Sequence, residues 1–411
     1  MTQISQDFAP PFKLIAPFFI IGGFFYLISS FFLFSFDVEN LSFLSPKTIS
    51  FIHMFLLGFV MMVIFGAMAQ LVPVVLEVGH FAVELFYAIW PLLLIGTILM
   101  VFGFLYAPGL VPYGGVVVLI SMMIFVMEIF MTISKVKELS LVMSSVLISN
   151  TFLFFGIIVG LTMALGFAGV ISVDIFSLLR SHVYLVIGGY IGVTIMGISI
   201  VLLPMFMLSH GFSLKPLKIA IWMMSSGVSF VVLSSFIHSS FFEYVGYLLS
   251  IFSLFVYFYL IFIIYKTRPR KENDVYIFSL YFSYGAMIVG LLFALLYFMT
   301  HKESILLASG WLFFYGFFAF LISGHIYKII PFLVWFERFS PLVGKQKVPM
   351  LADMVPVRGA NLQFIASAMG VVLVTFALLA QSNTMMGAGV SFLVVGAFAL
   401  IKNIFYMINF R

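Results

Sequence analysis

Twelve long apolar runs, separated by short polar breaks, make up most of this 411-residue chain. A transmembrane helix needs about 20 consecutive apolar residues. The composition agrees, because 64% of the residues are hydrophobic and only 8% are charged, against roughly 45–50% and about 25% in soluble domains. We therefore predict an all-α polytopic membrane protein, a single membrane domain embedded in the lipid bilayer, and we exclude a soluble enzyme or a secreted module. The runs lie at about 13–36, 47–77, 84–106, 112–134, 141–168, 174–208, 217–238, 242–265, 274–300, 304–336, 361–381 and 386–409.

The distribution of basic residues predicts how these spans are oriented. With the N-terminus placed inside, only Lys47, Arg180 and Lys302 of the 19 lysines and arginines fall on the outer side. The positive-inside rule then places both termini in the cytoplasm, in a bacterial inner membrane. The first run lacks a cleavage pattern, so we expect a retained span. The net charge of +5 is spread over short loops and forms no basic face, which argues against nucleic acid as a partner.

The three longest runs share one spacing: a glycine, seven residues, a second glycine, six residues and a proline. Glycines eight residues apart lie on nearly one helical face and let another helix approach closely, and a proline kinks a helix. The spacing predicts three pseudo-repeated four-helix units, at about 13–134, 141–265 and 274–409, although glycine and proline are also frequent in membrane helices generally. The matching residues are Gly58, Gly66 and Pro73; Gly189, Gly197 and Pro204; and Gly316, Gly324 and Pro331.

Histidines are the main metal-ligand candidates, because the chain has no cysteine. The predicted topology sorts the seven into an outer layer of four and an inner group of three. Ionisable groups within spans are rare and usually face a functional interior, so His53 and His182 are the strongest candidates. The outer layer is His53, His182, His238 and His301, and the inner group is His80, His210 and His325.

An outer layer of imidazoles is typical of metal or haem binding, since neutral imidazole is the commonest metal ligand and haem iron accepts axial histidines. A haem between helices needs two histidines at equal depth, which allows His53 to pair with His301 or with His182. His325 lies too deep to pair with His53, by about 21 Å of helical rise. Arg180 and Lys302 stand beside outer histidines, either as partners of haem propionates or as headgroup anchors.

The inner group has plainer interpretations. His80 and His210 have the sequence setting of loop histidines at a membrane interface, and His325 is either a hydrogen-bonded core residue or an inner proton or substrate group. Two further ionisable residues fall within spans. We expect Lys328 to extend towards the inner surface, and Glu128 to do the same near Lys135.

Together, the spans and histidine positions resemble the catalytic subunit of the haem-copper oxidase superfamily. That family has twelve spans in three groups of four, with metal ligands in spans two, six and ten and at the end of span seven. The resemblance implies that His53 and His301 hold a b-type haem, while His182 and His238 bind copper or face a vacant haem position. This chain has single histidines where the oxidases have pairs, and Tyr184 follows His182 by two residues where the family has four.

Span two, with Phe-Ile-His-Met-Phe-Leu-Leu-Gly-Phe around His53 and then Gln-Leu-Val-Pro, is similar to the NnrS-type membrane proteins. These shortened relatives are linked to haem, copper and nitric oxide stress. The resemblance implies a haem-binding protein, with or without copper, that acts in respiration or nitric oxide handling. Its partners would be a small gas or redox ligand and an electron donor, and enzymatic activity stays open.

Two rival functions remain. Kinked helices around a shared centre, with Glu128 and Lys328 inside spans, are compatible with a transporter of haem, copper or a small anion. Transporters built from two halves show a twofold repeat, whereas the repeat in this chain is threefold, which favours the haem hypothesis. A scaffold without a cofactor is the third reading. A hydrolase is excluded, because no catalytic triad pattern, zinc-peptidase motif or phosphate loop occurs.

Overall fold

The computed structural model describes residues 8, 10–269 and 271–411, and all regular structure in these ranges is helical. Twelve helices are long and apolar enough to cross a membrane. Each begins and ends within four residues of the predicted bounds, so the prediction of a twelve-span membrane protein is confirmed. The spans are Phe12–Ser35, Pro46–Leu76, Val83–Tyr106, Pro108–Ile133, Leu141–Phe167, Ile175–Met207, Lys215–Ile237, Ser240–Lys266, Val275–Thr300, Glu303–Arg338, Val357–Ala380 and Asn383–Ile408.

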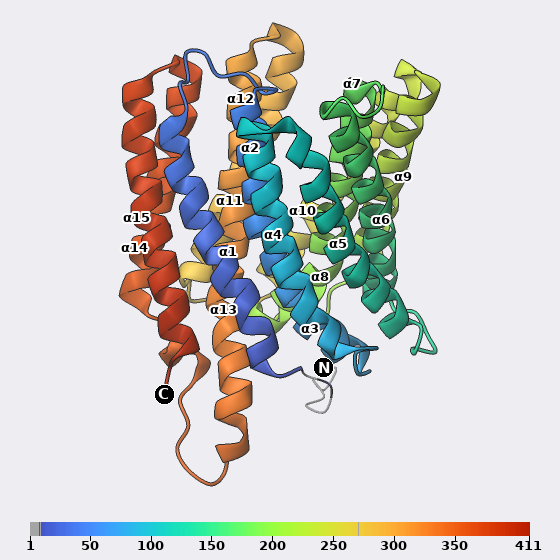
Figure 1. Cartoon of the computed structure of the whole chain (residues 1–411). Coiled ribbons are helices and arrows are strands. Elements are labelled where there is room, and N and C mark those ends of the chain that lie inside the picture. Colours follow the sequence, from blue (N-terminus) through green and yellow to red (C-terminus); the bar gives the residue numbers. More distant parts are fainter. Residues whose placement is uncertain (1–7, 9, 270) are drawn as a thin grey trace. The chain divides into compact units, whose positions relative to one another are not determined.

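Nine spans are built around one α-helix each (Figure 1). In lipid every backbone polar group must find a partner within the chain, and a helix provides one for nearly all of them. These nine are α1 (Phe12–Phe32), α4 (Phe86–Tyr106), α5 (Val111–Ile133), α6 (Leu141–Phe167), α9 (Lys215–Ile237), α10 (Ser240–Lys266), α11 (Val275–Thr300), α14 (Val357–Ala380) and α15 (Asn383–Ile408).

The second, sixth and tenth spans have a different construction. Each joins two α-helices through a π-helical segment, and each carries one of the three prolines of the glycine–proline spacing. The first is α2 (Pro46–His53), η3 (Met54–Met61) and α3 (Met62–Leu76); the second is α7 (Ile175–Val183), η6 (Tyr184–Gly192) and α8 (Val193–Met207); the third is α12 (Glu303–Trp311), η7 (Leu312–Phe318) and α13 (Ala319–Arg338).

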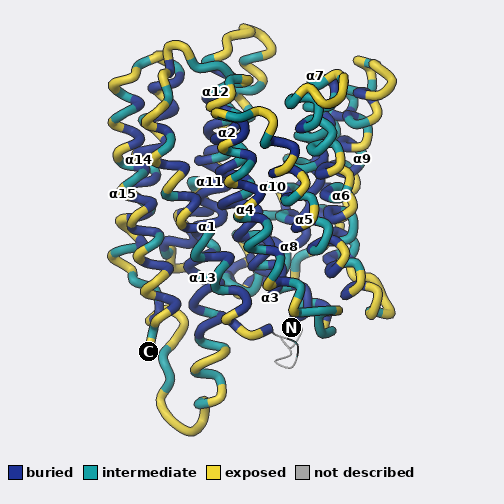
Figure 2. Tube along the Cα trace, in the orientation of Figure 1, coloured by how far each residue is buried: buried dark blue, intermediate teal, exposed yellow. Residues whose placement is uncertain are grey.

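The chain divides into two compact units. The first comprises Met1–Ala9, Leu71–Leu99 and Ala107–Glu272, and the second comprises Pro10–Gln70, Met100–Tyr106 and Asn273–Arg411. The sixth span lies wholly in the first unit, and the tenth lies wholly in the second. These long spans form much of the interior: 72%, 61% and 67% of the best apolar window of the second, sixth and tenth spans is buried, more than in any other span (Figure 2).

Local sequence signals explain where many helices begin and end. Ser45, Ser140, Asp174, Asp274 and Ser382 precede helices, and each side chain accepts a hydrogen bond from a backbone N–H of the first turn, which satisfies a donor that the helix leaves unpaired. Several helices end at a residue with left-handed backbone. These ends are Leu208, His238, His301 and Gln381, with φ between 52° and 58°.

The glycines of the long spans serve as close-approach points for a neighbouring helix. A Cβ atom added to the first or second glycine of each span would collide with the helix that precedes it in the chain. The two residues met on that helix are seven positions apart every time, which is two helical turns. The contacts are Gly58–Phe25 and Gly66–Phe18 on α1, Gly189–Phe152 and Gly197–Ser145 on α6, and Gly316–Ala286 and Gly324–Ser279 on α11.

A second set of glycines brings the two following spans together. In α9 and α10, a Cβ on Gly227 would lie 2.8 Å from the carbonyl oxygen of Gly246, and a Cβ on Gly246 would lie 2.7 Å from that of Gly227. Small residues allow such backbone proximity between membrane helices. Two other pairs show one side of this arrangement: an added Cβ would lie 3.1 Å from the carbonyl oxygen of Gly114 on α5 when placed on Gly96 of α4, and 2.9 Å from that of Gly389 on α15 when placed on Gly370 of α14.

The second unit also holds a buried chain of neutral polar side chains. The amide nitrogen of Asn403 donates to the Tyr327 hydroxyl at 2.9 Å, and that hydroxyl donates to the amide oxygen of Gln363 at 3.3 Å. The Gln363 nitrogen in turn donates to the Ser367 hydroxyl at 3.2 Å. All four residues are at most 2% exposed. The chain therefore ties α13, α14 and α15 together by directional bonds.

Candidate functional site

His53 ends α2 and immediately precedes the π-helical segment η3. Its Nδ1 lies 2.8 Å from the carbonyl oxygen of Ile49, one turn earlier in the helix. A carbonyl oxygen only accepts, so Nδ1 carries the proton, and the neutral ring has its lone pair on Nε2. The imidazole packs against Phe104 with ring centroids 4.9 Å apart. His53 therefore carries its proton on Nδ1, the tautomer in which a metal would bind at Nε2.

His182 has a matching arrangement in the first unit. Its Nδ1 lies 2.9 Å from the carbonyl oxygen of Gly156 on α6, so this ring also carries its proton on Nδ1. The imidazole lies against Gly160 of the same helix, where an added Cβ would be 2.7 Å from Cε1 of the ring. The two glycines, one turn apart, thus provide both the hydrogen-bond acceptor and the space for the ring.

Both histidines stand at the start of a π-helical segment, since His182 precedes Tyr184–Gly192 by two residues. Short π-helical segments within α-helices are rare and frequently occur at functional sites. The third long span has Trp311 before its π-helical segment, in the place that His53 has in the second span. The Trp311 ring stacks on Tyr315 and its Nε1 donates to the carbonyl of Val371 at 3.1 Å. This position is therefore occupied by a packing residue in the third span.

His238 and His301 lie in a different setting from His53 and His182. Each is the residue that ends a helix, with φ of 52°, and each is exposed. His301 follows α11 and its ring lies 6.0 Å from that of Tyr297. Left-handed backbone at a helix end is a common way to terminate a helix. Ending a helix is therefore a sufficient structural role for both histidines. Their roles as haem or copper ligands stay predictions.

The two outer cations also have structural roles. Arg180 donates to Glu243 at 2.7 Å, and Glu243 accepts a further hydrogen bond of 2.6 Å from the Tyr247 hydroxyl. A propionate would have to compete with this carboxylate for Arg180. Lys302 is exposed and precedes the first turn of α12. Their contacts with haem propionates therefore remain a prediction.

The interior beside the tenth span bears on the predicted pairing of His53 with His301. The face of the second span opposite His53 carries Phe51 and Phe55, whose rings stack on the buried Tyr315 at 5.8 and 4.7 Å. An apolar hollow next to this stack is lined by Phe51 and Ile52 but not by His53. His53 instead faces Phe104. Phe51 and Phe55 thus occupy the side of the second span that faces Tyr315, and the pairing of His53 with His301 stays a prediction.

The donor set fits a haem iron better than copper. Within the described residues no group of three or more histidines, aspartates and glutamates lies close enough together to hold a metal ion, and protein copper sites are commonly built from such groups. A haem iron needs only one or two axial side chains. His53 and His182 each have Nε2 as the acceptor nitrogen, so each could supply one axial ligand.

Sequence reasoning missed the most buried ion pair of the first unit. His80 lies in the loop after α3, as predicted, but its side chain is only 3% exposed and its Nδ1 lies 2.8 Å from Oε1 of Glu128. Glu128 does not reach towards Lys135; that lysine instead donates to the carbonyl oxygens of Gly79 and His80. A glutamate in an apolar helix predicts a buried partner, yet nothing in the sequence indicates that His80 is the partner.

The remaining ionisable residues have ordinary partners. His325 has its Nδ1 2.7 Å from the Leu321 carbonyl and its Nε2 3.4 Å from the Tyr276 hydroxyl, as expected of a hydrogen-bonded core histidine. Lys328 donates to Asp274 at 2.6 Å, so its ammonium group ends on a carboxylate at the start of α11. His210 is exposed in a loop, as predicted.

Comparisons with known proteins add no further constraint. The chain matches no protein-family model and no curated protein sequence.

Proposed function

We propose that this chain is a haem-binding membrane protein in which His53 and His182 are the candidate iron ligands. The observation that carries the proposal is the tautomer shared by the two imidazoles. In both, a backbone carbonyl holds Nδ1–H and leaves Nε2 as the acceptor nitrogen. Metal-bound histidines almost always donate their other ring N–H to such an acceptor, which fixes the ring and raises its basicity.

The proposed setting is respiration or nitric oxide metabolism in a bacterial inner membrane, with cytoplasmic termini and an electron donor as partner. A bound haem supplies an iron that exchanges electrons or binds a small gas. The chain orients its imidazoles through Ile49 and Gly156 and surrounds His53 with apolar groups such as Phe104. An apolar shell of this kind limits the access of water to a metal site.

The threefold repeat supports the resemblance to the haem-copper oxidase and NnrS-type proteins. In each proposed four-helix unit the long span meets the preceding helix at two residues seven positions apart, and a glycine pair joins the next two helices. All three long spans also contain a π-helical segment that includes the first glycine of the spacing. Recurrence of three independent features at matching places favours three related units over chance.

Haem titration of the purified apoprotein tests the proposal. We expect a Soret band that weakens or shifts in His53→Ala or His182→Ala, because each variant removes one candidate ligand. His210→Ala is the matched control, since His210 is exposed in a loop. A protein that stays colourless after haem supplementation, or a band that neither substitution alters, would sink the proposal.

A transporter of haem, copper or a small anion is the second candidate function. The fully buried Glu128, paired with His80, is the observation in its favour, because intramembrane ionisable residues often mark transport pathways. Uptake into sealed vesicles under an imposed proton gradient would separate the candidates. A haem protein that handles electrons or gas moves no solute in this assay.

A further inference from the structure

Glu128 is the most completely enclosed carboxyl group in the membrane-spanning part of the first unit. It projects from α5 one turn before the C-terminal end of that helix, and its side chain is 0% exposed. An ionised carboxylate is costly to bury unless its charge is compensated. The compensation comes from His80, whose imidazole is 3% exposed and packs on the ring of Phe86 at 4.8 Å.

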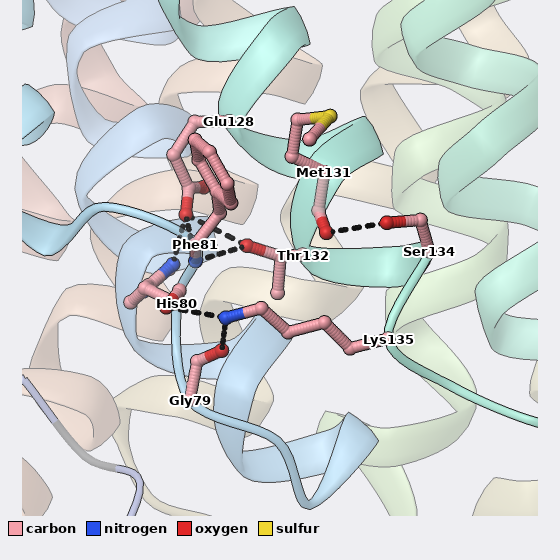
Figure 3. Close-up of polar contacts among 8 residues, drawn as sticks. All are labelled: Gly79, His80, Phe81, Glu128, Met131, Thr132, Ser134 and Lys135. Carbon is pink, nitrogen blue, oxygen red and sulfur yellow. Dashed lines mark hydrogen bonds and ion pairs between the residues drawn. The ribbon is translucent and has the colours of Figure 1, made fainter.

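The two carboxylate oxygens of Glu128 have unequal surroundings (Figure 3). Oε1 is close to three donors: Nδ1 of His80 at 2.8 Å, the backbone N–H of Phe81 at 3.1 Å and the Thr132 hydroxyl at 2.7 Å. Oε2 is buried and has no hydrogen-bond partner among the described residues. A buried acceptor without a partner destabilises the fold. Oε1 therefore makes the structural hydrogen bonds, while Oε2 is available to a further ligand.

A proton is the ligand that this geometry suits best. His80 Nδ1 lies against an acceptor oxygen, so the pair carries a proton there, and the imidazolium–carboxylate form is neutral overall. Taking up a second proton on Oε2 neutralises the carboxylate and leaves the net charge of the pair at plus one. The Oε1 bonds from Phe81 and Thr132 survive this change, so the site can gain a proton without losing its backbone connections.

A lysine lies at the exposed end of the cluster. Lys135 is exposed and its ammonium group reaches the carbonyl oxygens of Gly79 and His80 at 3.1 and 2.9 Å. Four other charged side chains that the structure describes on the segments around the cluster are exposed; they are Glu77, Glu84, Lys137 and Glu138. Among the described residues, His80 is therefore the only charged group in direct contact with Glu128.

We propose that Glu128 and His80 form a proton-binding site at the end of α5, with Oε2 of Glu128 as the atom that takes up the proton. The proposed site uses neither His53 nor His182. The site also couples proton uptake to the backbone of residues 79–81. Glu128, Thr132 and Lys135 form hydrogen bonds with this backbone, which follows the helix that contains Pro73.

Infrared difference spectroscopy of the purified chain in lipid nanodiscs tests the site. Spectra are compared across about pH 5 to about pH 9. We expect the C=O stretch of a protonated, water-shielded carboxyl group to appear as pH falls and to be absent in Glu128→Gln. The matched control is Glu138→Gln, which removes an exposed carboxylate and leaves the signal in place.

His80→Gln guards against a folding artefact. Glutamine still donates a hydrogen bond to Oε1 but removes the positive charge, so the Glu128 signal should appear at higher pH than in the native chain. A purely structural ion pair predicts a different pattern. In that case the native chain shows no protonated-carboxyl signal over the whole range, and His80→Gln shifts nothing; either result overturns the proposal, even if Glu128→Gln fails to fold.

Discussion

The imidazole of His182 lies inside a membrane-spanning helix against Gly160, whereas the imidazole of His301 projects from a helix end into the surroundings. Both residues fall in the outer histidine layer that the topology predicts. His182 donates to a carbonyl on another helix, and His301 adopts the left-handed backbone that ends α11. A histidine near a membrane surface is therefore informative only together with its backbone conformation and the atom that holds its Nδ1.

The largest expected effect in this comparison is the loss of the His182 side chain. His182→Ala removes a hydrogen bond and leaves a void beside Gly160, so we expect destabilisation of about 2–3 kcal/mol. His301→Asn should stay within about 0.5 kcal/mol, because asparagine tolerates left-handed backbone and the site is exposed. Thermal unfolding midpoints in one detergent compare the two. Equal losses of stability in the two variants would show that His182 and His301 do not differ in structural role.

A smaller effect is expected from filling the space beneath the His182 ring. A Cβ at position 160 would lie 2.7 Å from the ring, so Gly160→Ala should displace the imidazole and cost about 1–2 kcal/mol. Gly285→Ala is the matched control, since no atom lies within 4 Å of a Cβ there, and it should gain about 0.5–1 kcal/mol of helix stability. If Gly160→Ala gained as much, the ring would not lie against Gly160.

The smallest effect is expected in the segment 36–45, which contains the exposed Asp37. Hydrogen bonds from Asn40 and then Asn383 hold the pKa of the Asp37 carboxyl below its ordinary value. Because the pKa of Asp37 is lower in the folded chain than in the unfolded chain, its carboxylate stabilises the fold fully at pH values above the ordinary pKa. This stabilisation is lost as the pH falls through the lowered pKa. We expect faster deuterium exchange in 36–45 on acidification. Asp37→Asn should show no such acid dependence, and an acid response that persists in this variant would assign the effect to another group.

The sequence was sufficient for the helices but not for their local distortions. Apolar runs of about 20 residues located every span within four residues, because the bilayer imposes helix length and backbone pairing. The glycine–proline spacing identified the three long spans that are most buried. The π-helical segments were not predicted, since an extra residue in a helical turn depends on packing between helices and changes no residue type.

The candidate site was predicted less completely than the helices, because side-chain partners depend on how the helices pack. His53 and His182 were selected as candidates because a histidine within an apolar run is rare, and their role as ligands stays a prediction. His238 and His301 were grouped with them by depth alone, and depth does not distinguish a ligand from a residue that ends a helix. The pairing of His80 with Glu128 joins residues 48 positions apart, and only the folded chain shows that a loop histidine turns inward to meet the carboxylate.

The hydrogen-bonded chain from Asn403 to Ser367 has a consequence for the order in which this protein is made. Tyr327 is synthesised before both helices that supply its amide partners. A nascent chain that stops after α13 exposes that hydroxyl to lipid or water, and the contact closes only when the last two helices have been inserted. The tenth span thus depends on the last two helices for both amide partners of Tyr327.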